Sequence, residues 1–85
     1  MKGRKYDLES VFQMLADRIR QIRKQRHLTE TEVAKRSGHP VSTIHGIENG
    51  DNKNPGFRTM YDLSRVLNFS LDKLAEELYS KEVRR

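Results

Sequence analysis

The sequence has no cysteine and no tryptophan, and its 85 residues include only two prolines. Without cysteine, the chain can form neither a disulfide nor a metal site built on thiolates. Its unbroken apolar runs reach only two or three residues, far short of the roughly 20 that a membrane-spanning helix needs. The basic opening stretch MKGRKYDLES also lacks the apolar segment of a secretory signal. These absences predict a soluble, cytoplasmic protein.

Catalytic and metal-binding patterns are scarce as well. The three histidines stand at positions 27, 39 and 45, so no pair is three or four residues apart, and no cysteine or paired carboxylate accompanies them. No nucleophile is paired with a base in a pattern that would support catalysis. We therefore expect no enzyme activity, no metal ion, no cofactor and no small-molecule ligand.

Positive charge is the first feature that points to a partner. The net charge is +5, and residues 1–28, with eight basic and three acidic side chains, carry an excess of that same size. A basic excess favours polyanions, nucleic acid first and an anionic membrane second. A solvated helix with surplus Lys and Arg would give the same count, so charge alone does not decide. We expect no membrane partner, because the apolar residues of the basic helix are needed for the core.

Apolar residues recur at spacings of three and four along the chain, which predicts a single small all-α domain of five helices. The first helix runs from Asp7 to about Arg26, as one helix or as two joined near Gln13. The others are expected within residues 28–38, 41–48, 57–68 and 70–80. The side chains expected to face inward are Leu8, Val11, Phe12, Leu15, Ile19, Ile22, Val33, Ala34, Ile44, Ile47, Phe57, Met60, Leu63, Ser64, Leu67, Leu71, Leu74 and Leu78.

Local signals mark where several of these helices begin and end. Thr29 followed by Glu32 forms a capping-box pattern at a helix start. Gly38 suits the left-handed residue that ends that helix, and Pro40 is typical of the first turn of the next one. Asn68 is an acceptable residue for the end of the helix that starts near Phe57. The second and third helices are therefore short and separated by only a few residues.

Two short helices joined by a tight, glycine-containing turn are the helix-turn-helix arrangement. In it, one helix braces on the DNA backbone while the next projects its outer side chains into the major groove. This spacing alone is only moderately specific, because many small helical proteins contain such a corner.

Residues 15–78 resemble the Cro/repressor-type (Xre) helix-turn-helix family. The resemblance lies in the stretches IRQIRK, LTETEVAKRSG, STIHGIENG, NP and FRTMYDLSRVLNFSLDKL. It implies a five-helix, lambda-repressor-like DNA-binding domain that regulates transcription, is expected to repress, and acts on double-stranded DNA as a homodimer. On this basis we divide the chain into an N-terminal arm or extension of the first helix (1–14), the domain itself (15–79) and a basic C-terminal tail (80–85).

The resemblance also implies roles for particular residues. The helix at about 41–48 enters the major groove, and the expected base contacts are Val41, Ser42, His45 and Gly46. Asn49 stands where the family donates a hydrogen bond to a phosphate. The full set of expected phosphate contacts is Arg18, Thr43, Asn49, Asn52, Lys53 and Arg58. Arg23 and Glu48 occupy positions that form a structural ion pair in the family.

The reading face departs from the family pattern. Glu30 replaces a Gln that clamps a phosphate, so its carboxylate would repel the DNA unless it turns to the helix dipole or pairs with a base. No Arg or amide side chain stands at the base-reading positions, which leaves His45 to donate to a guanine acceptor. Gly46 costs roughly 1 kcal/mol relative to Ala in a helix; it allows close approach to the DNA, or reflects a tight helix contact or simple tolerance. Thr43 is either a phosphate contact or a cap.

Two questions stay open from the sequence. The weakly polar reading face together with Glu30 also suits a protein-interaction module on the same fold, such as an antitoxin or an anti-repressor. The surface that joins two copies is expected either on the last helix, with Leu71, Leu74, Leu78 and Tyr79, or on the extra stripe formed by Leu8, Val11 and Phe12. These leucines also suit the chain's own core, which we prefer for Leu71 and Leu74.

Overall fold

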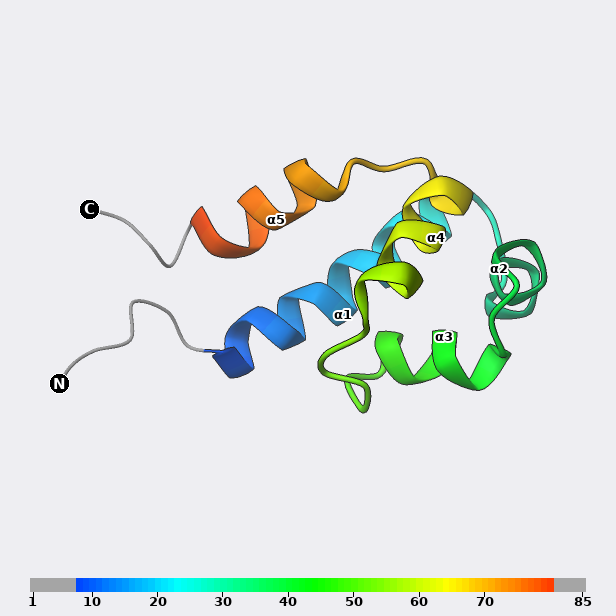
Figure 1. Ribbon diagram of the computed structural model, residues 1–85, viewed down its shortest axis with the longest axis horizontal. Helices are drawn as coiled ribbons and strands as arrows, with labels where there is room; N and C mark the ends of the chain where they lie inside the picture. Colours follow the sequence, from blue (N-terminus) through cyan, green and yellow to red (C-terminus); the bar gives the residue numbers. More distant parts are fainter. Residues whose placement is uncertain (1–7, 81–85) are drawn as a thin grey trace, which may run out of the picture.

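The computed structural model describes residues 8–80, and the side chains of residues 9–79 (Figure 1). Its helices are α1 (Leu8–Gln25), α2 (Glu30–Ser37), α3 (Val41–Glu48), α4 (Phe57–Leu67) and α5 (Leu71–Ser80). Residues 8–80 contain no strand. The expectation of an all-α, five-helix fold is confirmed.

Helix α1 is a single, unbroken helix, so the alternative of two helices joined near Gln13 does not apply. Residues 8–14 of the expected extension are therefore continuous with the rest of α1, and residues 1–7 lie outside the described part. Val11 is only 2% exposed and belongs to the core. The expectation that Val11 forms part of a surface between two copies is therefore wrong, because the chain itself already covers this side chain.

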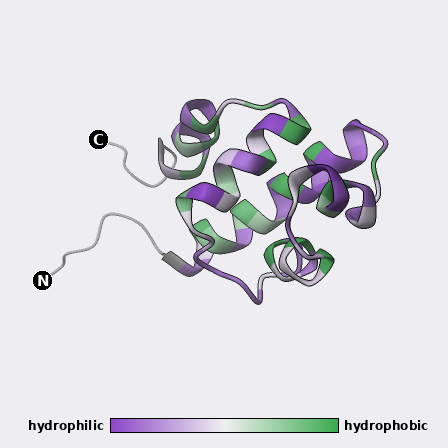
Figure 2. Cartoon of the chain, turned by 45° about the vertical axis from the view of Figure 1, so that its right-hand side comes forward, coloured by the Kyte–Doolittle hydropathy of each residue, from purple (hydrophilic) through white to green (hydrophobic). Residues whose placement is uncertain are grey.

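The core is formed by the inner faces of all five helices. Helix α3 packs on α1 and α2, α2 also packs on α4, and α5 packs on α1 and α4. Each helix carries both apolar and polar segments along its length, as amphipathic helices do (Figure 2). The buried apolar cluster consists of Val11, Ile19, Ile22, Val33, Ala34, Ile44, Ile47, Leu63, Leu67, Leu74 and Leu78.

The cap signals in the sequence have physical counterparts in the structure. The Thr29 hydroxyl accepts a hydrogen bond from the Glu32 N–H at 3.0 Å, and the Glu32 carboxylate accepts one from the Thr29 N–H at 2.8 Å. This reciprocal pairing lowers the pKa of Glu32. Gly38 and Asn68 both adopt the left-handed conformation at helix ends. Pro40 lies one residue before α3 in extended conformation, not in its first turn as expected.

One expectation about an inward-facing side chain is wrong. Phe57 is 76% exposed, because it is the first residue of α4 and follows a loop, so its part of the apolar stripe extends beyond the core. Its ring stacks on Tyr61, with ring centroids 6.3 Å apart. On α5, Leu74 and Leu78 are buried in the chain's own core, as the apolar stripe of this helix predicts. Neither side chain is therefore available to a contact surface between two copies.

Candidate nucleic-acid interface

Helices α2 and α3 are joined by the short segment from Gly38 to Pro40 and pack on each other (Figure 1). The inner side of α3 is anchored by Ile44 and Ile47, which are each 1% exposed. Its outer side carries Val41, Ser42 and His45, all exposed, while Thr43 and Gly46 are half-buried. Three of the four residues expected to contact bases therefore lie on an open surface of one short helix.

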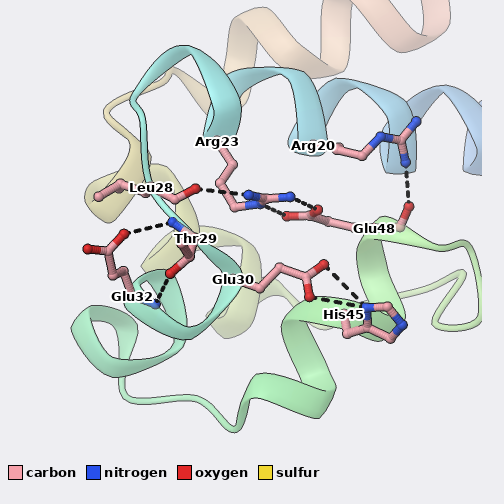
Figure 3. Close-up of polar contacts among 8 residues, drawn as sticks. All are labelled: Arg20, Arg23, Leu28, Thr29, Glu30, Glu32, His45 and Glu48. Atoms are coloured by element: carbon pink, nitrogen blue, oxygen red, sulfur yellow. Dashed lines mark hydrogen bonds and ion pairs between the residues drawn. The ribbon is translucent and has the colours of Figure 1, made fainter.

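An ion pair fixes the C-terminal end of α3 to α1 (Figure 3). Arg23 donates from Nε and Nη2 to the two carboxylate oxygens of Glu48, at 2.6 and 2.8 Å. These hydrogen bonds raise the pKa of the Arg23 guanidinium, against burial, which lowers it. Arg23 also donates to the Leu28 carbonyl, and Arg20 donates to the Glu48 carbonyl, each at 2.9 Å. Because Glu48 is only 3% exposed, its charge stays inside the protein and is not presented on the exposed side of α3.

Glu30, the residue that departs from the family pattern, has a partner within the protein. Its carboxylate oxygens lie 3.1 and 3.3 Å from Nδ1 of His45, so the first residue of α2 meets the middle of α3 (Figure 3). The His45 side chain is 62% exposed, whereas Glu30 is 27% exposed. The Glu30 carboxylate therefore pairs with a basic side chain, the imidazole of His45. As the first residue of α2, Glu30 also lies at the N-terminal end of the helix dipole.

Gly46 faces the loop that follows α3. The Asn52 N–H donates to the Gly46 carbonyl at 2.9 Å. A Cβ built on Gly46 would lie 3.6 Å from Cβ of Asn52, which is an ordinary van der Waals separation. The tight helix–helix contact considered for this glycine is absent. Its nearest neighbour is Asn52 in the loop, which leaves space for a methyl group in ordinary contact.

Several residues expected to contact phosphates already bind carboxylates of the same chain. Lys53 lies 3.2 Å from a carboxylate oxygen of Glu9 in α1. Arg58, whose side chain is 84% exposed, lies 3.2 Å from the carboxylate of Asp62. The Asn49 side-chain oxygen accepts from the Asp51 N–H at 2.9 Å. Asn49, Lys53 and Arg58 are all exposed, and Asn52 is half-buried.

Arg18 is the expected phosphate contact that the structure places elsewhere. It donates to the Glu77 carboxylate at 2.9 Å and so connects α1 to α5, whereas α3 packs on α1 and α2. Arg20, like Arg23, reaches from α1 to the end of α3. The sequence does not tell which of Arg18 and Arg20 lies near α3, because the sides of α1 that face α3 and α5 are defined only by the packing of these helices.

Sequence reasoning missed the pair formed by His39 and Asp62. His39 lies in the turn between α2 and α3, and its Nε2 is 2.8 Å from Oδ2 of Asp62 in α4. The hydrogen bond from His39, followed by that from Arg58, lowers the pKa of Asp62. This contact anchors the turn to α4, and no local pattern signals it because the two residues are 23 positions apart.

A shallow polar depression of about 240 Å³ lies where α1, α2 and α3 meet. Its lining includes three cations of α1, namely Arg20, Arg23 and Lys24, and it also includes Glu30 and His45. Within residues 8–80, no three His, Asp or Glu side chains gather closely enough to hold a metal ion. None of the helices there has the length and apolar character needed to span a membrane.

The profile of a helix-turn-helix family matches residues 19–74, from the middle of α1 into α5. The match covers well over half of the chain. The chain belongs to the Cro/repressor-type (Xre) helix-turn-helix family. It is therefore a DNA-binding helix-turn-helix regulator. No curated protein and no solved structure matches the regulator.

Proposed function

We propose that this regulator binds double-stranded DNA sequence-specifically, with α3 in the major groove, and represses transcription. The observation that carries the proposal is that α3 exposes Val41, Ser42 and His45 while the Arg23–Glu48 pair holds its inner side in place. The major groove is wide enough to admit one α-helix. A reading helix with a fixed orientation pays little conformational entropy on binding.

The proposed base contacts are few. Val41 packs on a thymine methyl group, and Ser42 hydrogen-bonds to a base edge. His45 presents its ring to a further base. Gly46, with Asn52 against it, offers no side chain of its own, so we assign it the role of letting the backbone of α3 approach the DNA.

Most of the binding free energy is proposed to come from phosphate contacts. We assign these to Thr43, Asn49, Asn52, Lys53 and Arg58. Arg20 replaces Arg18 as the contact from α1, because Arg20 reaches the end of α3 whereas Arg18 pairs with Glu77 on α5. Lys53 exchanges the exposed carboxylate of Glu9 for a phosphate, and exposed ion pairs contribute only about 0–1 kcal/mol, so this exchange costs little. Arg58 leaves the half-buried carboxylate of Asp62, which keeps its contact with His39.

The test is a binding measurement on a selected sequence. A random duplex library is enriched on the regulator, and fluorescence anisotropy then compares the enriched duplex with a scrambled duplex across a salt series. We expect a preference of at least ~10³ for the enriched duplex, and a steep loss of affinity with salt. Equal, weak and salt-sensitive binding to both duplexes would refute sequence-specific regulation. A reporter placed behind the enriched site distinguishes repression from activation.

The regulator is also proposed to bind as a homodimer, since the family usually acts on two-fold operators. Two recognition helices would then lie about 34 Å apart, one turn of DNA. Light scattering of the complex with the enriched duplex should give two chains per duplex. The enriched sequence should also contain two inverted half-sites.

The alternative of a protein-interaction module, such as an antitoxin or anti-repressor, has lost part of its basis. It depended on Glu30 facing a phosphate with no compensating partner and on a weakly polar reading face. Because Glu30 pairs with His45 of the same chain, we do not propose this alternative as a second function.

A further inference from the structure

The Glu30–His45 pair places a constraint on which nitrogen of His45 carries the proton. A carboxylate can only accept hydrogen bonds, and an ordinary Glu is ionised at neutral pH. Both carboxylate oxygens of Glu30 lie within 3.3 Å of Nδ1 of His45. The proton of the neutral imidazole therefore belongs on Nδ1, where it is shared with the carboxylate.

The other ring nitrogen then has a defined role. With the proton on Nδ1, Nε2 of the neutral ring is an acceptor. In Figure 3 the ring turns Nε2 away from Glu30, on the exposed side of α3. An acceptor at this place cannot donate to N7 or O6 of guanine. It can accept a hydrogen bond from N4 of cytosine or N6 of adenine, the two amino groups on the major-groove edge.

We propose that Glu30 is a positioning residue that fixes the tautomer of His45, so that the regulator reads an exocyclic amino group of cytosine or adenine there and discriminates against guanine. This inference rests on the proposed function, because it assumes that α3 enters the major groove. It also reverses the expectation that His45 donates to guanine. Glu30 itself does not touch the DNA in this arrangement.

The surroundings of the pair hold it in place. Glu30 is the first residue of α2, next to the capping box, so the helix start fixes its backbone. Glu30 also lines the same depression as Arg23 of α1, so an opposite charge lies near its carboxylate. His45 lies on a helix whose inner side is packed against α1 and α2. Neither partner therefore depends on a loop for its position.

The first measurement uses the free regulator at pH 8, where an ordinary imidazole is neutral. Nitrogen NMR of labelled histidine should show His45 with a protonated Nδ1 and an unprotonated Nε2. In Glu30→Ala the proton should move toward Nε2. In Glu30→Gln the amide oxygen can still accept from Nδ1, so the wild-type tautomer should be largely kept. An Nε2-protonated His45 in the wild type would overturn the proposal.

The second measurement uses anisotropy on duplexes in which each base pair of the enriched site is varied. His45→Ala identifies the position that His45 reads. At that position the wild type should prefer cytosine or adenine over guanine by about three- to tenfold, the effect of one hydrogen bond. Glu30→Ala should lose or reverse this preference, and Glu30→Gln should restore it in part. Circular dichroism establishes that each variant is folded.

A matched control distinguishes the effect of Glu30 on the tautomer of His45 from the effect of its negative charge on DNA binding. Glu77→Ala also removes one negative charge, but at the contact between α1 and α5, and it should leave every base preference unchanged. If Glu30→Ala strengthens binding to all duplexes equally, Glu30 acts only through its charge and the proposal is overturned. If His45→Ala changes no base preference while specific binding persists, the inference fails and the proposed function stands. If the wild type shows no base preference at all, the proposed function fails together with the base-reading role, and NMR still decides the tautomer.

Discussion

Replacing Gly46 by alanine is expected to make the regulator more stable and to weaken its binding to DNA. Gly46 lies inside α3, where alanine is favoured over glycine by about 1 kcal/mol. The added methyl group would lie 3.6 Å from Cβ of Asn52, an ordinary contact that displaces nothing. We therefore expect the free energy of unfolding to rise by about 1 kcal/mol. In a domain of this size that corresponds to a rise in Tm of about 4–8 °C.

Thermal and urea unfolding followed by circular dichroism measure this change. The matched control is Gly38→Ala, the same substitution at a left-handed residue with φ of +77°, which should lower stability by about 1–2 kcal/mol. If Gly46→Ala leaves stability unchanged or lowers it, the assignment of free space beside Gly46 is wrong. If it stabilises the fold without weakening DNA binding, glycine is merely tolerated and the proposed close approach of α3 to the DNA is refuted.

Three further predictions concern the contacts around α3. Glu48→Ala leaves Arg23 buried without its partner, which should cost about 3–5 kcal/mol in urea unfolding; a loss below 1 kcal/mol would contradict an anchoring role. The contacts of Asp62 lower its pKa in the folded protein. The stability that Asp62 contributes is therefore fully present at a pH above the ordinary pKa of Asp, and it is lost as the pH falls through the lowered pKa of the folded state. The difference in stability between the wild type and Asp62→Asn should therefore vanish at low pH, and a difference independent of pH would contradict this cause. Arg20→Ala should reduce the salt dependence of DNA binding by one phosphate contact, a slope change of about 1, whereas Arg18→Ala should leave it unchanged.

The helix ends were predictable because short-range physics sets them. The Thr29–Glu32 capping box satisfies backbone N–H groups within one helical turn. Gly38 and Asn68 end their helices by adopting a backbone conformation that few residues tolerate. In each case, a stretch of a few residues contains both the cause and its effect.

Tertiary placement of side chains was less predictable. Phe57 fits the apolar stripe of α4, but periodicity cannot tell whether a neighbouring element covers the first residue of a helix. The pairs His39–Asp62 and Glu30–His45 join residues 23 and 15 positions apart. A pairing of this kind depends on how whole helices pack, and one sequence holds no local sign of it. The two helices of the helix-turn-helix could therefore be located from the sequence, while the partners of their side chains could not.

In α3 the residues that hold the helix in the fold differ from the residues on its exposed side, and this difference affects how such regulators can diversify. Ile44, Ile47 and Glu48 supply the buried side of the helix, whereas Val41 and Ser42 are exposed and lie outside the buried cluster. A gene duplicate could therefore change these two outer residues freely and acquire a new operator while its fold stays intact. His45 is less free to change, because a substitution there also leaves Glu30 without its partner on the proposed DNA-binding surface. Descendants of this regulator should therefore vary residues 30 and 45 together, and residues 41 and 42 independently.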